Sequence, residues 1–222
     1  MNRIFNIWIL IVTVITFPVA IAVGKNLDFN LFGIAIQGEE FPYQDVIFTI
    51  SAALIFLLGA LRSSKKWIGM NVVKQVKRFK FSTPISEGRK SRVLLYNVLE
   101  ILFFLSFAAG LFYFTLSTIY IVLVFIILSV DSIINTILGL KAQRYRVGIT
   151  KNAVVMADRE TKAIYFTGLQ RISKHQQTLY FEYSNGLVLH FPTNLIPEDQ
   201  WELFETTLRQ QVSQEKVYYT GF

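Results

Sequence analysis

The segment AVVMADRETKAIYFTGLQRISKHQQ, residues 153–177, has the pattern of a sheet-forming region. Its apolar and polar residues alternate, and a period of two is typical of half-buried strands in a small sheet. The residues before it differ, because most of the first 140 belong to apolar runs long enough to sit in a bilayer. The pattern therefore predicts a membrane region followed by a sheet-forming region.

The region around this segment is predicted to form short strands separated by turns. Two turns are marked by Lys151-Asn152 and Asn185-Gly186, and the second pair is the strongest short hairpin signal. A further turn is expected at residues 159–161. Because successive strands are joined by tight turns, antiparallel pairing is expected. The predicted strands are 144–150, 153–158, 162–168, 170–176, 179–184 and 187–192.

A helix is predicted to close this region, in PEDQWELFETTLRQQ, residues 197–211. A proline and acids in the first turn are typical of a helix start. Trp201, Phe204 and Leu208 lie at i, i+3 and i+7, which gives the helix one apolar face. Six antiparallel strands capped by this helix predict an α+β domain over residues 142–215, with the outline of a pleckstrin-homology-like (PH-like) barrel, followed by a tail at 216–222.

Residues 142–212 resemble the PH-like domain at the C-terminus of bacterial YcxB-like membrane proteins. The resemblance is carried by VGITKNAVVMADRETKAIYFTGLQRI, by LVLHFP and by the Trp/Phe/Leu helix, with Leu169 and Ile172 at apolar positions common in that family. It implies a cytoplasmic binding or assembly module without enzyme activity. The chain departs from the family in having four predicted spans where two are usual, and Thr193 where a basic residue often follows the proline.

Four apolar runs predict four transmembrane helices within a domain of residues 1–141. The first resembles a signal peptide, but its apolar run is long and no small-residue cleavage site follows, so a retained span is predicted. The sequence TLST between the last two runs predicts a tight turn and an antiparallel helix hairpin, since one continuous helix would exceed the bilayer thickness. The predicted spans are about 4–24, 45–62, 93–116 and 118–140.

The loops between these spans differ in charge. Residues 62–92 hold ten Lys or Arg and one acid, whereas residues 24–45 hold one Lys and four acids, Asp28, Glu39, Glu40 and Asp45. The positive-inside rule therefore predicts cytoplasmic N- and C-termini. The resemblance to bacterial YcxB-like proteins implies that the membrane is a bacterial inner membrane. The same rule accounts for the net charge of +7 without a nucleic-acid partner.

The basic loop contains a segment of helical period, residues 65–81. Ile68, Val72, Val73, Val76 and Phe79 share one arc, and basic residues fill much of the other. One interpretation is a helix in the headgroup plane that binds anionic lipid; the other is that the charges only fix topology. The basic residues of this predicted surface helix are Lys65, Lys66, Lys74, Lys77, Arg78 and Lys80.

Two acids, Glu100 and Asp131, fall inside predicted spans, where an ionisable group is costly. Folding the hairpin at residues 116–117 brings them to the same depth. The resulting patch is either a proton or cation site or a set of hydrogen bonds that hold helices together. The predicted patch consists of Asn97, Glu100, Asp131 and Asn135, completed by Ser129 and Ser132.

Signals of catalysis are absent from the sequence. It has no cysteine, no glycine-rich phosphate loop and no paired metal-ligand spacing, and His175 and His190 stand alone in predicted strands. No catalytic residue, metal or cofactor is therefore predicted. Basic residues of the sheet region are interpreted either as contacts to a headgroup or partner or as ordinary surface: Lys151, Arg159, Lys162, Arg171 and Lys174.

The sequence thus leads to two functional hypotheses. In the first, a non-enzymatic membrane protein binds a protein partner, or a second copy of itself, through its PH-like domain and basic loop, with anionic lipid as a further ligand. In the second, a small transporter or ion-coupled protein uses Glu100 and Asp131.

Overall fold

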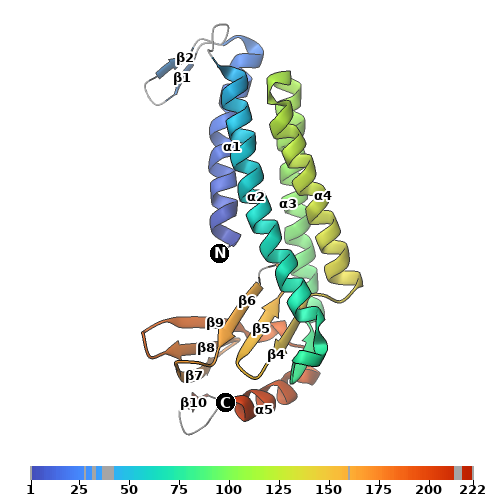
Figure 1. The fold of residues 1–222 in the computed structure, drawn as a ribbon, viewed down its shortest axis with the longest axis vertical. Helices are drawn as coiled ribbons and strands as arrows, with labels where there is room; N and C mark the ends of the chain where they lie inside the picture. The colour runs from blue at the N-terminus through green and yellow to red at the C-terminus, as the bar shows by residue number, and fades with distance from the viewer. Residues whose placement is uncertain are drawn as a thin grey trace. The chain divides into compact units, whose positions relative to one another are not determined.

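The structure is a computed structural model that describes residues 2–27, 29–31, 34–36, 43–159, 161–212 and 217–221 (Figure 1). The chain divides into two compact units. Unit 1 comprises Met1–Ser64 and Tyr96–Asn135, and unit 2 comprises Lys65–Leu95 and Thr136–Phe222. Residues 65–92 of the basic loop, predicted as part of the membrane domain, therefore belong by their contacts to the unit that contains the sheets.

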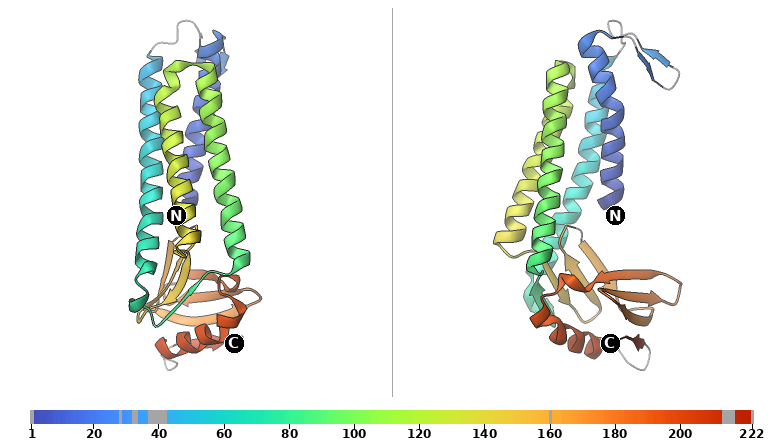
Figure 2. Two further views of the ribbon diagram at one scale, coloured as in Figure 1. Left: turned by 90° about the vertical axis from the view of Figure 1, so that its right-hand side faces the viewer. Right: turned by 180° about the vertical axis from the view of Figure 1, so that it is seen from behind.

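Four helices of the described residues are long and apolar enough to cross a membrane, as the sequence predicted. The turn between the last two is the 3-10 helix η2, Leu116–Thr118, in which the Thr115 hydroxyl accepts a hydrogen bond from the Ser117 amide at 3.3 Å. Figure 2 shows these two helices side by side as an antiparallel hairpin. The helices are α1 (Asn2–Lys25), α2 (Gln44–Lys74), α3 (Glu87–Phe114) and α4 (Ile119–Lys141).

Unit 1 has an aromatic-rich core between its helices. Phe104 of α3 stacks on Phe125 of α4, with ring centroids 5.6 Å apart, and Phe17 of α1 makes an edge contact with Phe107 at 5.2 Å. Large apolar side chains such as Leu57 and Leu102 remain exposed on the outside of the bundle. This distribution is expected of helices that lie in lipid, where apolar surface needs no burial.

A short hairpin of β1 (Phe29–Leu31) and β2 (Ile34–Ile36) follows α1 in the predicted outer loop. Of the four acids that the topology prediction used there, Asp45 lies in the first turn of α2. The other three, Asp28, Glu39 and Glu40, lie outside the described residues.

Unit 2 contains two four-stranded sheets. Their strand orders are β3-β4-β5-β6 and β10-β7-β8-β9, and every neighbouring pair is antiparallel except β10 and β7. The helix α5 (Trp201–Gln211) follows the last antiparallel strand after two 3-10 turns, η3 (Thr193–Leu195) and η4 (Glu198–Gln200). The strands are β3 (Phe81–Pro84), β4 (Arg146–Ile149), β5 (Ala153–Ala157), β6 (Thr161–Tyr165), β7 (Leu169–His175), β8 (Thr178–Tyr183), β9 (Val188–Pro192) and β10 (Tyr218–Thr220).

All six predicted strands are present, as β4 to β9, and the predicted C-terminal helix is α5. The expected turns occur at Lys151-Asn152 and Asn185-Gly186, where Gly186 has a φ of +80°. The turn at 159–161 includes Glu160, which lies outside the described residues. The six-strand prediction was incomplete, because β3 and β10 extend the two sheets. The predicted tail at 216–222 contributes β10.

The position of β3 changes the connectivity of the whole chain. β3 pairs with β4 over four residues, from Phe81 opposite Ile149 to Pro84 opposite Arg146. Neighbouring strands are therefore joined by residues 85–145, which contain both α3 and α4. The α3–α4 hairpin is an insertion within the first sheet, and the sheets are not a simple C-terminal appendage.

The core of unit 2 draws on every part of its sequence. Phe204 of α5 stacks on Phe191 of β9 at 5.4 Å and makes an edge contact with Phe81 of β3 at 5.6 Å. On the first sheet, Val73 of α2 packs with Ala153, Val155 and Ala157 of β5. The sheets thus pack against segments that come before and after the predicted strands.

The basic segment does not form a helix of its own. α2 runs without a break from the second apolar span to Lys74, η1 (Val76–Arg78) follows, and β3 begins at Phe81. Of the predicted apolar arc, Val73 is buried, with 1% of its surface exposed, whereas Ile68 is 62% exposed. The difference arises because β5 and β6 offer an apolar surface, on which the helix buries Met70 and Val73.

Gly69 explains how closely α2 approaches the first sheet. A Cβ atom at this position would overlap the side chain of Thr161 on β6. The Thr161 hydroxyl also donates a long hydrogen bond, 3.5 Å, to the Lys65 carbonyl oxygen of α2. Only a glycine permits this contact between helix and strand.

Candidate functional site

A groove of about 400 Å³ lies on unit 2 beside the end of α2 and η1. Its surface is mainly apolar, and it lies on the side of α2 opposite the one that buries Met70 and Val73. Because successive helical residues are 100° apart, burying one face on the sheet leaves the other exposed. The groove is lined by Ile68, Asn71, Val72, Gln75, Arg78, Phe79 and Thr150.

One cation, Arg78, lines this groove, which we call the basic groove. Its neighbours in the chain, Lys74, Lys77 and Lys80, are exposed. Ile68, Val72 and Val76 are also exposed, although large apolar side chains in water are unfavourable. An apolar groove lined at one place by an exposed arginine fits an amphiphile with an apolar chain and an anionic head.

The remaining residues of the predicted surface helix lie elsewhere. Lys66 is buried, with 5% of its surface exposed, and Lys65 is half-buried next to the contact with Thr161. Neither lysine lines the basic groove, and Lys66 is buried on the packed side of α2.

The predicted basic residues of the sheets lie on different strands and turns. On β7, the Arg171 Nε donates to the Thr220 hydroxyl at 3.1 Å, and the Lys174 Nζ lies 4.7 Å from the centroid of the Trp201 ring. Both therefore contact other parts of unit 2. The five residues lie at three places: in the β4–β5 turn (Lys151), around the β5–β6 turn (Arg159 and Lys162) and on β7 of the other sheet (Arg171 and Lys174).

The polar patch predicted inside the spans lies within unit 1. The Ser132 hydroxyl of α4 donates to Glu100 Oε1 of α3 at 2.5 Å, and the Ser63 hydroxyl of α2 donates to Asp131 Oδ2 at 2.7 Å. The other two predicted members, Asn97 and Asn135, are buried. Three helices are thus joined through polar groups that are buried or partly buried.

Arg62 is the member of this patch that the sequence did not assign. Its guanidinium forms an ion pair with Glu100, and the two side chains are only 5% and 8% exposed. The sequence placed Arg62 at the end of a span and counted it among the topology-setting charges. Its position at the end of the second predicted span, with an acid about two turns into the third, was the available signal.

Arg62 changes what this cluster can do chemically. Two neighbouring carboxylates must share a proton or bind a cation unless a counter-charge is present, and Arg62 supplies one to Glu100. A buried ion pair with further hydrogen bonds holds helices in register. The geometry therefore favours a structural role for this cluster over an ion-binding one.

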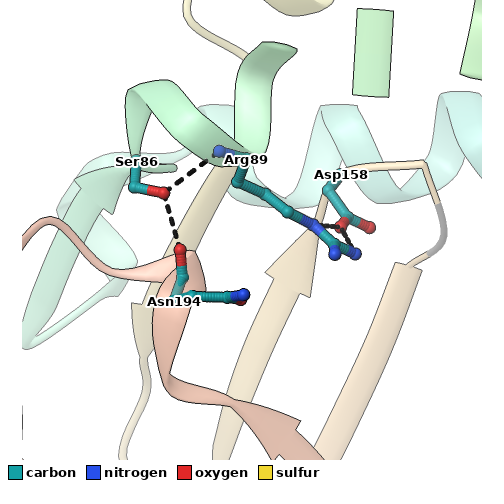
Figure 3. Close-up of polar contacts among 4 residues, drawn as sticks. All are labelled: Ser86, Arg89, Asp158 and Asn194. Atoms are coloured by element: carbon teal, nitrogen blue, oxygen red, sulfur yellow. Dashed lines mark hydrogen bonds and ion pairs between the residues drawn. The ribbon is translucent and has the colours of Figure 1, made fainter. Parts of the chain in front are cut away.

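A second charged contact joins the start of α3 to the sheets (Figure 3). The Ser86 hydroxyl caps the helix by accepting from the Arg89 amide at 3.3 Å, and it donates to the Asn194 carbonyl oxygen at 2.6 Å. The Arg89 guanidinium donates twice to Asp158 Oδ2, at 2.9 and 2.6 Å. One helical turn thus contacts η3 after β9 and the end of β5.

Groups that bind metals are not assembled in the part of the chain that the structure describes: no three of its His, Asp or Glu side chains could hold an ion. His175 and His190 both pack on Tyr180, with ring centroids 5.6 and 4.9 Å apart. No family model matches this chain, and no curated protein or solved structure matches it either.

Proposed function

We propose that this chain is a non-enzymatic membrane protein of the bacterial inner membrane, whose PH-like unit docks a protein partner and binds anionic lipid at the basic groove. The orientation proposed is N- and C-termini in the cytoplasm, because the basic residues concentrate in 62–92. The PH-like assignment is supported by seven antiparallel strands, β3 to β9, in two sheets followed by the helix α5.

The observation that carries the lipid proposal is the composition of the basic groove. Arg78 stands beside exposed Ile68 and Val72, and α2 connects this surface directly to an apolar span. Near an anionic membrane each basic residue contributes about 1 kcal/mol. A phospholipid with one acyl chain along the apolar lining and its phosphate at Arg78 would satisfy both halves of the groove.

The test uses the full chain in detergent, with phosphatidylglycerol or phosphatidylcholine added in mixed micelles and bound lipid counted by native mass spectrometry. Phosphatidylglycerol should bind preferentially. The Lys74→Gln/Arg78→Gln variant should weaken that binding at least tenfold, because two cations supply about 2 kcal/mol before salt screening.

The matched control is Arg92→Gln/Lys141→Gln, which removes the same charge from exposed positions outside the groove. It should bind phosphatidylglycerol as the unaltered chain does. Equal binding of the two lipids, or equal weakening by both variants, would show that the groove does not select anionic lipid.

A further inference from the structure

The edge of the second sheet is covered by the C-terminal strand. β10 pairs with β7 in parallel, with Tyr218 opposite Arg171, Tyr219 opposite Ile172 and Thr220 opposite Ser173. An uncovered edge strand presents a row of free backbone donors and acceptors and can pair with any extended segment that fits. Here the covering strand is only three residues long, so side chains must supply much of its specificity.

Contacts on the α5 side hold the tyrosine at the centre of β10. The Tyr219 hydroxyl donates to the Val212 carbonyl oxygen at 3.4 Å, and the Arg209 guanidinium lies 5.4 Å from the centroid of its ring. Burial raises the pKa of the Tyr219 hydroxyl, an effect that the nearby Arg209 opposes. Val217, which precedes the strand, is buried in the core of unit 2. The β7 edge and α5 therefore recognise an apolar residue and a tyrosine two positions later.

The residues after Tyr219 add further requirements. The Thr220 hydroxyl accepts from Arg171 Nε at 3.1 Å. Gly221 has a φ of +80°, and a Cβ atom there would lie 2.5 Å from the Lys174 carbonyl oxygen, so a glycine is needed. Tyr218, in contrast, is 75% exposed. The segment that fits this edge thus has the pattern apolar–any–Tyr–Thr–Gly.

The chain's own strand leaves part of this site open. A cavity of about 460 Å³ lies beside it, lined by Gln170, Arg171, Glu182, Tyr218, Tyr219 and Thr220. A terminal strand that makes its contacts after a connecting segment can make the same contacts on a neighbouring copy, which is the usual route to an exchanged dimer.

We propose that the β7 edge with α5 is a docking site for an extended peptide, and that its partner is the C-terminal segment of a second copy of this chain. The C-terminal segment of a second copy has the same residues 217–221, of which 218–220 pair with β7 within one chain. Each copy's own β10 competes with it for the β7 edge. This inference rests on the proposed docking function and names its protein partner. It uses none of the basic-groove residues, so the lipid test can fail or succeed independently.

The first test exploits the absence of cysteine from the sequence. Tyr218→Cys and Arg171→Cys are introduced into separate full-length chains with different tags, which are mixed in detergent, reconstituted together and oxidised mildly. Opposed residues on paired strands lie about 5 Å apart at Cβ, within disulfide range. Exchange should give tagged heterodimers at least fivefold above the control pair Tyr218→Cys with Lys162→Cys, which lies on the other sheet. Heterodimer yields no higher than this control would overturn the proposal.

The second test measures the docking site directly with the labelled peptide VYYTGF, residues 217–222. A chain truncated after Val212 should bind the peptide at least tenfold more tightly than the intact chain, because β10 of the intact chain competes for the same edge. A peptide with Tyr219→Ala or Gly221→Val should lose at least tenfold in affinity. If the shortened chain does not fold, intact Gly221→Val replaces it, because this substitution displaces only the chain's own strand. A folded chain with an open β7 edge that fails to bind the peptide would overturn the proposal.

Discussion

Arg62 is a single residue whose charge distinguishes a structural role of the Glu100 cluster from an ion-binding role. Its ion pair with Glu100 is buried on both sides. Removing one partner of such a pair leaves a buried charge without compensation, at a cost of about 3–5 kcal/mol. We therefore expect Arg62→Ala to lower stability by roughly 3 kcal/mol or more, measured by reversible unfolding in mixed micelles.

The double variant Arg62→Met/Glu100→Gln is the control, because it removes both charges while retaining much of the side-chain volume. It should regain most of the lost stability. If Glu100→Gln instead left stability unchanged and abolished a proton or cation flux in vesicles, the ion-coupled hypothesis would be supported.

At the scale of elements, the first turn of α3 is tied to β5 by Arg89 and Asp158. The Asp158 side chain is 6% exposed and accepts both hydrogen bonds, whereas Arg89 is 28% exposed. Hydrogen bonds to a charged group contribute about 1.5–3 kcal/mol, and the partial exposure of Arg89 places this one toward the lower end. Arg89→Ala should therefore destabilise unit 2 by about 2 kcal/mol and speed amide exchange over residues 86–95.

Lys90 provides the matched control one residue further on. Its ion pair with Glu87 spans 2.6 Å, but the Glu87 side chain is 87% exposed. Exposed pairs contribute about 0–1 kcal/mol, so Lys90→Ala should change stability little. Equal changes in stability for Arg89→Ala and Lys90→Ala would show that the ion pair of Arg89 with Asp158 contributes no more than an exposed pair.

The elements also show which parts of this fold a sequence can predict. β4 to β9 were predictable because each is bounded by local turn signals such as Asn185-Gly186, and hairpin partners are neighbours in the chain. β3 was not, because FSTP carries no alternating pattern and its partner lies beyond residues 85–145. β10 was missed for a similar reason, since three residues in a parallel pairing give no periodic signal.

The candidate sites, like the strands, were predictable where they depend on local structure and not where they depend on distant segments. Helical spacing and the hairpin turn were enough to bring Glu100 to the depth of the neighbouring residues Asp131 and Ser132, because the hydrogen bond between Ser132 and Glu100 depends on the α3–α4 hairpin alone. The contribution of Arg62, on a third helix, depended on how α2 packs against the hairpin. The basic segment was predicted as an amphipathic helix, but which of its faces is buried was set by β5 and β6.

At the scale of the whole molecule, the insertion of the apolar helices α3 and α4 between β3 and β4 leads us to expect that the sheets do not fold without the first 141 residues. A fragment of residues 142–222 lacks β3 and loses five buried side chains, Met70, Val73, Phe81, Ile85 and Val93. At about 2 kcal/mol each, their burial contributes about 10 kcal/mol, as much as the whole stability of a typical domain. The fragment should show no cooperative thermal transition and no dispersed amide spectrum.

Co-expression with residues 1–141 should restore the missing strand and packing, and the two pieces should then purify together as a folded complex. The pairing of β3 with β4 predicts that Gly148→Pro weakens this association, because proline removes an amide from a strand with a neighbour on each side. A fragment of 142–222 that folds alone, with a sharp transition, would mean that β3 only covers an edge. The loss of folding in the fragment and its recovery with 1–141 would mean that the sheets and the membrane helices fold as parts of one interleaved chain.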